Sequence, residues 1–253
     1  MIKVVGVIPA RLRSTRLKEK VLEPICGRPM IQHVWERAKQ AEKLTDLIVA
    51  CDDPRIEMCV RNFGGKAFLT RLDHPNGTSR VAEIAGRVSA EVFVNIQADE
   101  PMIHPQAINA LADVFAHHAE TDVATLAVRC RERADYENPN VVKVICDERG
   151  DAIYFSRSPI PFYRDGIGES FSYLKHLGIY GYRKDFLLQF VGWKPGILEG
   201  AEKLEQLRIL ERGFKIRVLE TPYDSFSVDT LEDLRFVEQK LKNRSVHGTA
   251  KAG

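Results

Sequence analysis

The chain has 253 residues, with 37 lysines and arginines against 35 aspartates and glutamates, and 44% of its residues are hydrophobic. A globular chain of this length buries a large core without disulfides or structural metals. The net charge of +2 argues against polybasic binding to nucleic acid or membranes, and no apolar run approaches the roughly 18 residues of a membrane span. The chain begins with a strand-like segment and not with a signal peptide. Its five cysteines are widely spaced without a CxxC pair, so we expect reduced thiols in the cytoplasm.

The first half of the chain alternates short apolar runs with helical patterns. Repeated βα units of this kind predict an α/β fold with a mostly parallel sheet and helices on both faces. Asp53 and Pro54 mark a helix start, and Thr78 is a plausible N-cap. The predicted strands are 4–8, 47–50, 66–69, 92–96 and 123–128, and the predicted helices are 29–44, 54–64, 79–88 and 105–117.

The pattern changes after Cys130. Two strand-like segments flank Asp147-Glu148-Arg149-Gly150 and predict a β-hairpin. We interpret roughly 130–195 as an inserted β-rich lobe on a body made of 1–130 and 196–243, with 244–253 as a flexible tail. The remaining predicted elements are strands at 141–146, 151–155, 174–182 and 215–219, and helices at 199–211 and 230–242. The last helix begins with Thr230 and Asp233 at the spacing of a capping box.

A basic loop follows the first predicted strand. It contains Arg11, Arg13, Arg16, Lys18 and Lys20. Ligands in doubly wound sheets bind beyond the carboxyl ends of the strands, and guanidinium and ammonium groups suit phosphate oxygens. The loop therefore predicts an anionic ligand, although it lacks the glycines of a Walker loop. A solvated charged loop is the structural alternative, and such loops seldom follow a fully apolar strand directly.

Acidic residues follow two other predicted strands. Asp99 and Glu100 come after the strand at 92–96, and Asp229 ends the last predicted strand. Each could simply cap the helix that follows. Two acids facing one cationic loop would repel each other, however, and a divalent cation that also touches phosphate would remove that conflict. The turn at Asn76-Gly77 could present backbone groups to a nucleobase, but a structural turn is the favoured interpretation.

Several motifs occur in order between residues 8 and 230. They include Ile8-Pro9-Ala10-Arg11, Ser14-Thr15-Arg16-Leu17 with Lys20, Thr70-Arg71-Leu72-Asp73-His74, Gln97-Ala98-Asp99-Glu100-Pro101, Phe155-Ser156-Arg157, the run from His176 to Tyr182, Leu204-Glu205-Gln206-Leu207-Arg208 and Val228-Asp229-Thr230. Each motif is weak alone, but the ordered set is specific. It resembles the CMP-Kdo synthetases, which are 3-deoxy-manno-octulosonate cytidylyltransferases.

The resemblance implies a three-layer fold of the nucleotide-diphospho-sugar transferase type and a homodimer. It implies transfer of a cytidylyl group from CTP to Kdo with Mg²⁺, in the cytoplasm of a cell that makes lipopolysaccharide, with the lobe serving sugar binding and dimerisation. Lys20 and Arg11 would neutralise phosphate charge during catalysis. Carried over by position, Arg11, Ser14, Arg16 and Lys20 would hold the triphosphate; Arg71, Gly77 and Thr78 would frame the cytosine; Asp99 and Asp229 would bind Mg²⁺; and Gln97, Arg157, His176, Tyr180, Glu205 and Gln206 would line the sugar pocket.

Three positions depart from the family pattern: Ala98 replaces a usual glycine, Ser79 a usual glutamate, and Lys18-Glu19 the commoner Pro-Gly. Three alternatives stay open at this point. The first is a cytidylyltransferase for amino-Kdo or another 2-keto sugar acid, since one altered contact could change the sugar. The second is a glycosyltransferase, which would be expected to carry an Asp-x-Asp pair. The third is a catalytically silent nucleotide-binding module, against which the intact Lys20, Asp99 and Asp229 count.

Overall fold

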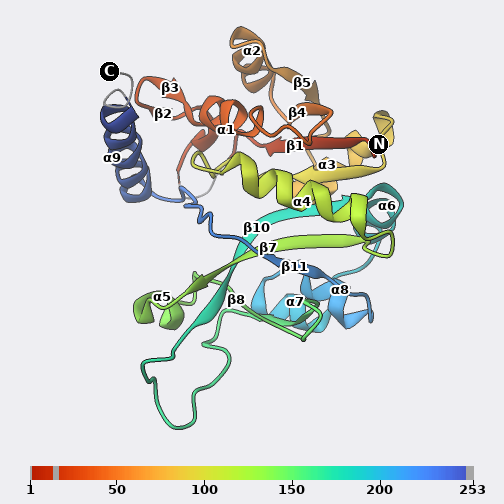
Figure 1. Cartoon of the computed structure of the whole chain (residues 1–253). Coiled ribbons are helices and arrows are strands. Elements are labelled where there is room, and N and C mark those ends of the chain that lie inside the picture. The colour runs from red at the N-terminus through yellow and green to blue at the C-terminus, as the bar shows by residue number, and fades with distance from the viewer. Residues whose placement is uncertain (1, 14–16, 249–253) are drawn as a thin grey trace.

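The computed structural model describes residues 2–13 and 17–248, with side chains up to residue 243. Its main sheet has the strand order β11-β7-β10-β6-β1-β4-β5 (Figure 1). The parallel part joins β1 (Val4–Ala10), β4 (Asp46–Cys51), β5 (Lys66–Leu69) and β6 (Val92–Asn95). β10 (Tyr173–Arg183) is antiparallel to β6 and to β7 (Val123–Cys130), and β11 (Arg217–Glu220) is parallel to β7. The predicted mostly parallel sheet is confirmed.

Helices cover both faces of this sheet because its strands are apolar on both sides. Along β1, Val4 and Ile8 pack into one core and Val5 and Val7 into the other, as the period of two requires. The first core includes α1 (Met30–Ala38), α2 (Pro54–Asn62) and α4 (Pro105–His117). The second includes α3 (Gly77–Arg87), α6 (Lys184–Val191) and α8 (Leu207–Glu211). The result is a three-layer α/β arrangement.

The segment after β7 extends the sheet at one end. It contains α5 (Arg133–Glu137) and the antiparallel pair β8 (Lys143–Cys146) and β9 (Ala152–Ser156), which confirms the predicted hairpin. β8 pairs with the first part of β10, and a long loop between β9 and β10 reaches away from the sheet (Figure 1). The rest of β10 lies in the middle of the main sheet. The division into a body and a lobe at about 130–195 stays a prediction.

A bulge interrupts β10 beside β7. Leu177 lies opposite Leu126 and Tyr180 opposite Thr125, so β10 has two more residues than β7 in this interval. The Thr125 hydroxyl donates to Ile179 O at 2.7 Å and so holds the bulge in place. Because the excess is even, side chains on the two sides of the bulge keep their faces.

Aromatic rings line that face of β10. The ring centroids of His176 and Tyr180 are 5.4 Å apart, and those of Tyr180 and Tyr182 are 5.7 Å apart. Phe155 of β9 adds an edge contact to His176 at 4.9 Å. The period-two spacing of these three β10 residues places them on one face of the strand.

Two of the predicted helices end early or are interrupted. The helix predicted at 29–44 ends at Ala38 and is followed by turns, in which Ala41 is buried and the Asn109 side chain accepts the Lys43 N–H at 3.0 Å. The helix predicted at 199–211 is two helices, α7 (Ile197–Glu202) and α8. Lys203 between them has a φ of 53°, in the left-handed region, and this reversal breaks the helix.

The first turn of α3 is capped by Asn76 and not by Thr78 as predicted. Asn76 Oδ1 accepts the Ser79 N–H at 2.8 Å. The Thr78 hydroxyl instead donates to Glu205 Oε2 at 2.7 Å. The prediction placed the cap two residues late because threonine at the turn is also a good capping residue.

The last helix, α9 (Leu231–Gly248), stands apart from the sheet at the end of a long connecting segment (Figure 1). Its capping box is confirmed: Asp233 Oδ2 accepts the Thr230 N–H at 2.8 Å, and Asp233 N–H donates to the Thr230 hydroxyl at 3.2 Å. The helix includes 244–248, where a flexible tail was predicted, because an established helix needs only one further backbone bond per added residue. Residues 249–253 of that prediction lie outside the described residues.

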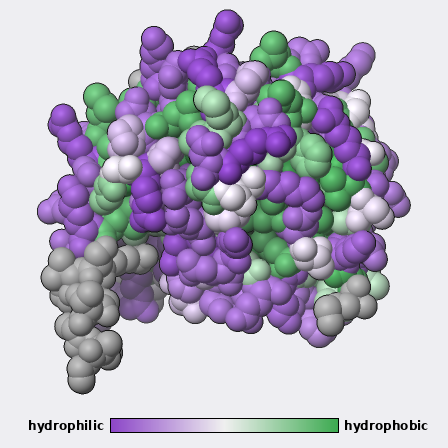
Figure 2. Space-filling view, turned by 90° about the horizontal axis from the view of Figure 1, so that it is seen from above, coloured by the Kyte–Doolittle hydropathy of each residue, from purple (hydrophilic) through white to green (hydrophobic). Residues whose placement is uncertain are grey.

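The surface is mainly polar. Figure 2 shows a face on which hydrophilic side chains cover most of the area and apolar groups form smaller clusters between them. In the described part of the chain, no helix has both the length and the apolar character needed to span a membrane.

Candidate active site

Two acids from separate segments meet at one lysine. Lys20 Nζ lies 2.7 Å from Asp99 Oδ2 and 3.0 Å from Asp229 Oδ1. Lys20 begins the short helix η1 (Lys20–Leu22), and Asp99 follows β6. Val228 N–H donates to Asp99 O at 2.9 Å, which fixes the two acidic segments side by side. Residues 221–230 form no strand, so Asp229 does not end one as predicted, but the two acids do converge beside the basic loop.

The electrostatics of this group favour a fully charged lysine. Burial alone would lower the pKa of Lys20, but the charges and hydrogen bonds of Asp99 and Asp229 outweigh burial and raise it. The two carboxylates thus direct their oxygens at one cationic position.

Carboxylate oxygens are the hard ligands that Mg²⁺ prefers, usually one or two of them together with phosphate oxygens and water. The described residues hold no group of three His, Cys, Asp or Glu side chains arranged for a metal. The donor set of Asp99 and Asp229 therefore fits a magnesium ion that takes its other ligands from a bound nucleotide.

A cavity of about 300 Å³ opens beside these residues, beyond the carboxyl ends of β1 and β6. Arg11 and Lys20 contribute positive charge to it, and Asn76 and Gly77 form the opposite side. A Cβ on Gly77 would lie 3.1 Å from Pro9 Cγ, so this turn approaches the end of β1 closely. The lining residues are Pro9, Arg11, Lys20, Val21, His74, Pro75, Asn76, Gly77, Arg80, Gln97, Ala98, Asp99 and Asp229.

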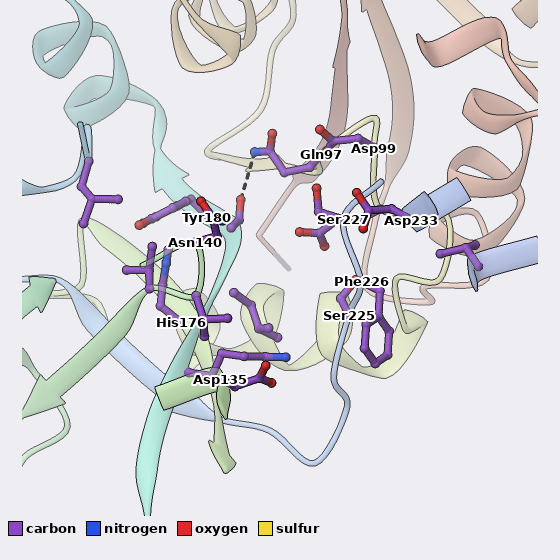
Figure 3. A pocket seen from close by; sticks show the side chains of 18 of the residues that line it. Gln97, Asp99, Asp135, Asn140, His176, Tyr180, Ser225, Phe226, Ser227 and Asp233 are labelled. Atoms are coloured by element: carbon purple, nitrogen blue, oxygen red, sulfur yellow. Dashed lines mark hydrogen bonds between the residues drawn. The ribbon is translucent and has the colours of Figure 1, made fainter. Parts of the chain in front are cut away.

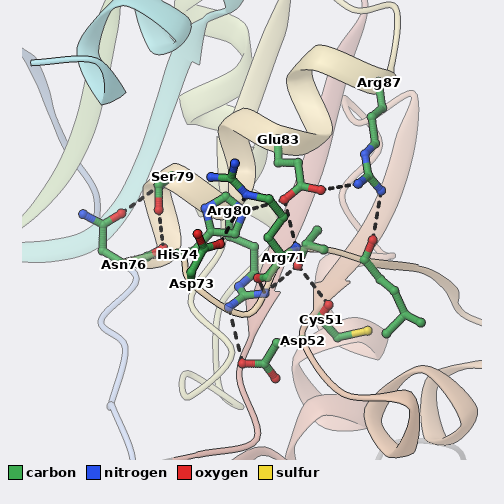
Figure 4. Close-up of polar contacts among 12 residues, drawn as sticks. Cys51, Asp52, Arg71, Asp73, His74, Asn76, Ser79, Arg80, Glu83 and Arg87 are labelled. Atoms are coloured by element: carbon green, nitrogen blue, oxygen red, sulfur yellow. Dashed lines mark hydrogen bonds and ion pairs between the residues drawn. The ribbon is translucent and has the colours of Figure 1, made fainter.

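Arg80 holds the loop behind this cavity (Figure 4). Its guanidinium, almost fully buried, donates to Arg71 O at 3.1 Å and to Asp52 Oδ2 at 3.3 Å. Asp52 Oδ1 in turn accepts the Leu12 N–H at 2.9 Å, which ties the same network to the beginning of the basic loop. The segment after β5 and the segment after β1 are therefore fixed to each other.

Glu83 of α3 makes a second connection to this loop (Figure 4). It accepts the Arg71 N–H at 3.1 Å and pairs with His74 and Arg87. Burial alone would raise the pKa of Glu83, but these donors outweigh it and lower the pKa. The charged form of Glu83 is thus the one that holds the loop.

The structure brings only some of the predicted nucleotide-binding residues to the smaller cavity. Arg11, Lys20 and Gly77 line the smaller cavity. Thr78 is buried and bonded to Glu205, and the Arg71 side chain is exposed, 3.3 Å from Asp73, outside the lining set. Ser14 and Arg16 lie outside the described residues.

One of the departures from the family pattern, Ala98, causes no backbone strain. In the described chain the non-glycine residues with positive φ are Glu19, Cys26 and Lys203, so Ala98 does not need the freedom of a glycine. Glu19 takes the left-handed conformation at the position where the family pattern has glycine, and its carboxylate pairs with Arg55 at 2.9 Å.

A second cavity, of about 610 Å³, adjoins the first (Figure 3). Gln97 and Asp99 line both, so the two cavities meet at the end of β6. Figure 3 shows His176 and Asp135 on one side and the segment with Ser225 and Phe226 on another. The lining residues are Gln97, Asp99, Glu100, Asp135, Asn140, Val141, Val142, Lys175, His176, Leu177, Gly178, Tyr180, Leu204, Gln206, Ser225, Phe226, Ser227, Asp233, Phe236 and Val237.

Several described residues that line this larger cavity also have a buried polar atom without a partner. In the described part of the chain, Glu100 Oε2, Tyr180 OH and Gln206 Nε2 are buried without a hydrogen-bond partner. Burial raises the pKa of Glu100 to about 7, with the nearby Asp99 charge adding to the effect. An unpaired buried polar atom is costly, so this wall suits a ligand that carries several hydroxyl groups.

Two other groups hold the wall in shape. Lys143 is fully buried and donates to Asn138 O at 3.0 Å, Val141 O at 2.7 Å and Arg157 O at 2.6 Å, which fixes the loop that carries Asn140. His176 Nε2 lies 3.1 Å from the Thr125 hydroxyl. Burial lowers the pKa of His176 to about 3, so the ring is neutral at physiological pH.

The predicted sugar-binding residues are only partly brought together. Gln97, His176, Tyr180 and Gln206 line the larger cavity. Arg157 does not line it, because its guanidinium donates to the backbone carbonyls of Glu202 at 2.7 Å and Pro139 at 3.0 Å.

Glu205 also lies outside the lining set, and it is not on a helix as predicted. It lies between α7 and α8 and accepts hydrogen bonds from the Asn76 amide at 2.8 Å and the Thr78 hydroxyl at 2.7 Å. Burial raises its pKa. Glu205 thus joins the start of α8 to the first turn of α3.

Sequence reasoning missed several lining residues. Lys175 immediately precedes His176, but neighbours in a strand point to opposite faces, so alternation gave no reason to choose both. Asp135, Asn140, Ser225 and Phe226 lie on a short helix or on segments without regular structure, where no periodic signal exists.

Comparisons with known proteins agree with this architecture. The family model for cytidylyltransferases matches residues 5–216. A 3-deoxy-manno-octulosonate cytidylyltransferase from Solibacter usitatus is 48% identical over 246 residues, covering 97% of each chain. The protein of the same name from Syntrophobacter fumaroxidans is 49% identical over 247 residues, covering 96% of this chain and 99% of its own.

The fold has a close counterpart among solved structures. A CMP:2-keto-3-deoxy-manno-octonic acid synthetase complexed with CTP aligns with a TM-score of 0.91 and 44% identity, over 96% of this chain and 99% of its own. A 4-diphosphocytidyl-2C-methyl-D-erythritol synthase from Anaerococcus prevotii, at 12% identity and a TM-score of 0.64 over 95% of this chain and 99% of its own, shares the fold alone. The chain therefore belongs to the cytidylyltransferase family and, within it, to the 3-deoxy-manno-octulosonate cytidylyltransferases.

Proposed function

We propose that this chain transfers the cytidylyl group of CTP to 3-deoxy-D-manno-octulosonate, giving CMP-Kdo and pyrophosphate for lipopolysaccharide synthesis. The observation that carries the proposal is the Lys20–Asp99–Asp229 group at the junction of two cavities. The smaller cavity has the basic residues that suit a triphosphate, and the larger has the unpaired polar atoms that suit a sugar. Close relatives of the same length carry the corresponding name.

The reaction is a displacement at the α-phosphorus of CTP. The anomeric hydroxyl oxygen of the sugar forms the new P–O bond, and the bond to pyrophosphate breaks. Gln97 and Asp99 lie where the two cavities meet, so the two reactants would be held with their reacting atoms adjacent. Lys20 and Arg11 would place positive charge at the phosphates, where charge is redistributed in the transition state.

The roles carried over from the family complete this proposal. Ser14 and Arg16 would join Arg11 and Lys20 at the triphosphate. Gly77, which lines the smaller cavity, would frame the cytosine together with Arg71 and Thr78. Gln97, His176, Tyr180 and Gln206 would contact the sugar directly, whereas Arg157 and Glu205 would have to act on it from outside the lining set.

Asp99 and Asp229 would hold a magnesium ion. When bound, the ion neutralises phosphate charge and lowers the pKa of a coordinated hydroxyl. The protein's own contribution is the fixed arrangement of the two acids: Lys20 bonds to both, and the Val228 N–H bond to Asp99 O keeps their segments together.

A homodimer in the cytoplasm is the remaining part of the proposal. Support for the dimer comes from apolar side chains in the segment 130–195: Ile153 is 58% exposed and Phe162 is 84% exposed. Sedimentation of the wild-type chain tests the oligomeric state, and a monomer at micromolar concentration would contradict the proposed dimer.

The decisive experiment incubates the protein with CTP, Kdo and Mg²⁺, with and without a chelator, and measures pyrophosphate and CMP-Kdo. We expect both products in equal amounts, and neither after chelation. Arms with ATP, with UTP and with an amino analogue of Kdo define the specificity. Pyrophosphate without CMP-Kdo would contradict the proposed acceptor, and a higher kcat/KM for the amino analogue would reassign it.

A further inference from the structure

The carboxylate of Asp233 holds the backbone that carries Asp229. Asp233 belongs to the first turn of α9. Its Oδ2 atom accepts the Asp229 N–H at 3.0 Å, the Thr230 N–H at 2.8 Å and the Thr230 hydroxyl at 2.9 Å. A capping box needs only the bonds that Asp233 and Thr230 exchange. The bond to the Asp229 N–H is therefore additional to capping, and it ties the position of Asp229 to the beginning of α9.

A small apolar cluster docks the same part of α9 onto the rest of the molecule. Its buried members are Ile25, Met30, Met102, Val228 and Val237, each of them at most 5% exposed. Val237 is the member that α9 contributes. Ile25 belongs to β2 (Pro24–Ile25), which α9 contacts (Figure 1). The helix stands apart from the main sheet, but its beginning is firmly packed.

The cluster draws on the segments that carry the three charged residues at the junction of the cavities. Ile25, Met102 and Val228 each lie within five positions of one of those charged residues in the sequence. Val237 packs in the same cluster. A tight apolar contact fixes the segments that share it relative to one another. The beginning of α9 thus contacts the site twice, through the Asp233 carboxylate and through this cluster.

We propose that Asp233 is a positioning residue for the metal ligand Asp229 and that the docked beginning of α9 holds this ligand beside Asp99. The inference deepens the proposed function, because it takes these two acids to be the ligands of the magnesium ion. Groups that orient a metal ligand affect metal affinity almost as strongly as the ligand does. Asp233 acts through the Asp229 backbone, since its Oδ2 atom already accepts three hydrogen bonds.

The test compares Asp233→Ala with wild type in two measurements. The first is the Mg²⁺ concentration that gives half the maximal rate of CMP-Kdo formation at saturating CTP and Kdo. The second is the Mg²⁺ concentration that gives half the Mg²⁺-dependent rise in melting temperature with CTP and without Kdo, which reports metal binding without turnover. CTP itself binds Mg²⁺ equally in every sample. We expect both concentrations to rise by about ten- to a hundredfold.

Asp147→Ala is the matched control. Asp147 Oδ1 accepts the Arg149 N–H at 2.9 Å and the Asp151 N–H at 2.8 Å in the turn between β8 and β9. It is thus also a carboxylate that holds backbone, but it lies outside the lining of both cavities. We expect a lower melting temperature and an unchanged Mg²⁺ requirement. Asp233→Asn, which keeps an acceptor oxygen at the same place in the side chain, should retain most of the wild-type affinity for Mg²⁺.

An unchanged Mg²⁺ requirement in Asp233→Ala, whether or not its melting temperature falls, would overturn the inference and leave Asp233 as a helix cap alone. Should Asp233→Ala fold poorly, Asp233→Ser, whose side chain is shorter by one atom and carries no charge, provides the same comparison. If wild type makes no CMP-Kdo at any Mg²⁺ concentration, the proposed function fails instead, and the melting measurement still tests the role of Asp233.

Discussion

The two cavities differ in how their polar groups are satisfied. Around the smaller one, two of the cations already have partners within the protein: Lys20 contacts Asp99 and Asp229, and Arg80 contacts Asp52. These groups are held in fixed positions by contacts within the protein. A site of this kind stabilises developing charge without rearranging first.

At the larger cavity, by contrast, some buried polar groups of the described residues lack partners. Glu100, Tyr180 and Gln206 each leave a buried polar atom without a partner in the described structure. Such atoms reduce the stability of the free protein. The comparison teaches that changes at the smaller cavity should affect turnover, whereas changes at the wall of the larger one should affect affinity for the sugar.

The largest effect should follow a change at the junction of the two cavities. Asp99→Asn removes a charge from the Lys20 contact and from the proposed cation site. We expect kcat to fall by about a thousandfold, while the melting temperature stays within a few degrees of wild type. Asp113→Asn, which removes the surface partner of Lys43, is the control. A wild-type rate for Asp99→Asn would refute the role of Asp99 as a metal ligand.

The support of the larger cavity should be the next most sensitive feature. Lys143→Met leaves three backbone carbonyls without their buried donor. The free energy of unfolding in urea should fall by about 2–4 kcal/mol. Replacing the exposed Lys194 in the same way should change it by less than about 0.5 kcal/mol. Similar stabilities for the two variants would show that the Lys143 bonds contribute nothing.

The pH dependence of stability should report the buried ring of His176. In the unfolded chain, His176 binds a proton below pH 6.5. In the folded chain, burial lowers its pKa, and the ring stays neutral until the pH falls to about 3. Stability from this group is therefore present above pH 6.5 and is lost as the pH falls toward 3. Between pH 7.5 and pH 5, wild type should lose about 1–2 kcal/mol more than His176→Gln. A constant difference between the two proteins at both pH values would contradict this.

The smallest expected effect concerns one unpaired amide. Gln206→Leu removes the Nε2 donor at the sugar wall. The KM for Kdo should rise by about tenfold, and the KM for CTP should stay within a factor of about two. Gln189→Leu, on the exposed side of α6, serves as the control. A rise in the KM for CTP instead of Kdo would reverse the contrast between the cavities.

Much of the fold could be predicted from local patterns. The strand at 66–69 and the helix at 105–117 were placed correctly, because the first is a short apolar run before a turn and the second begins with proline. The break at Lys203 could not be predicted, because a lysine in the left-handed region has no sequence signal. The turns after the shortened first helix are held by a residue distant in sequence, Asn109, 66 positions beyond its partner Lys43.

The candidate site, like the fold, could be predicted from the sequence only in part. The position of Asp99 beside the basic loop could be predicted, because strand ends on one edge of a sheet lie together. Asp229 joins them for another reason: its segment is not a strand and is held there by the Val228 N–H bond to Asp99 O. The separation of Glu205 from Gln206 could not be predicted, since after the reversal at Lys203 Gln206 lines the larger cavity whereas Glu205 bonds to Thr78 of α3. The catalytic and binding roles themselves came from the family resemblance and stay predictions until the variants are measured.

The bulge of β10 places a condition on the length of this strand. Two extra residues between Leu177 and Tyr180 leave the His176 and Tyr180 rings on one face. Loss or gain of a single residue there would turn the preceding half of the strand over and move His176 out of the wall. Insertions or deletions at this point should therefore be tolerated only when they add or remove residues in multiples of two. Aligned homologous strands should show even gaps here or none.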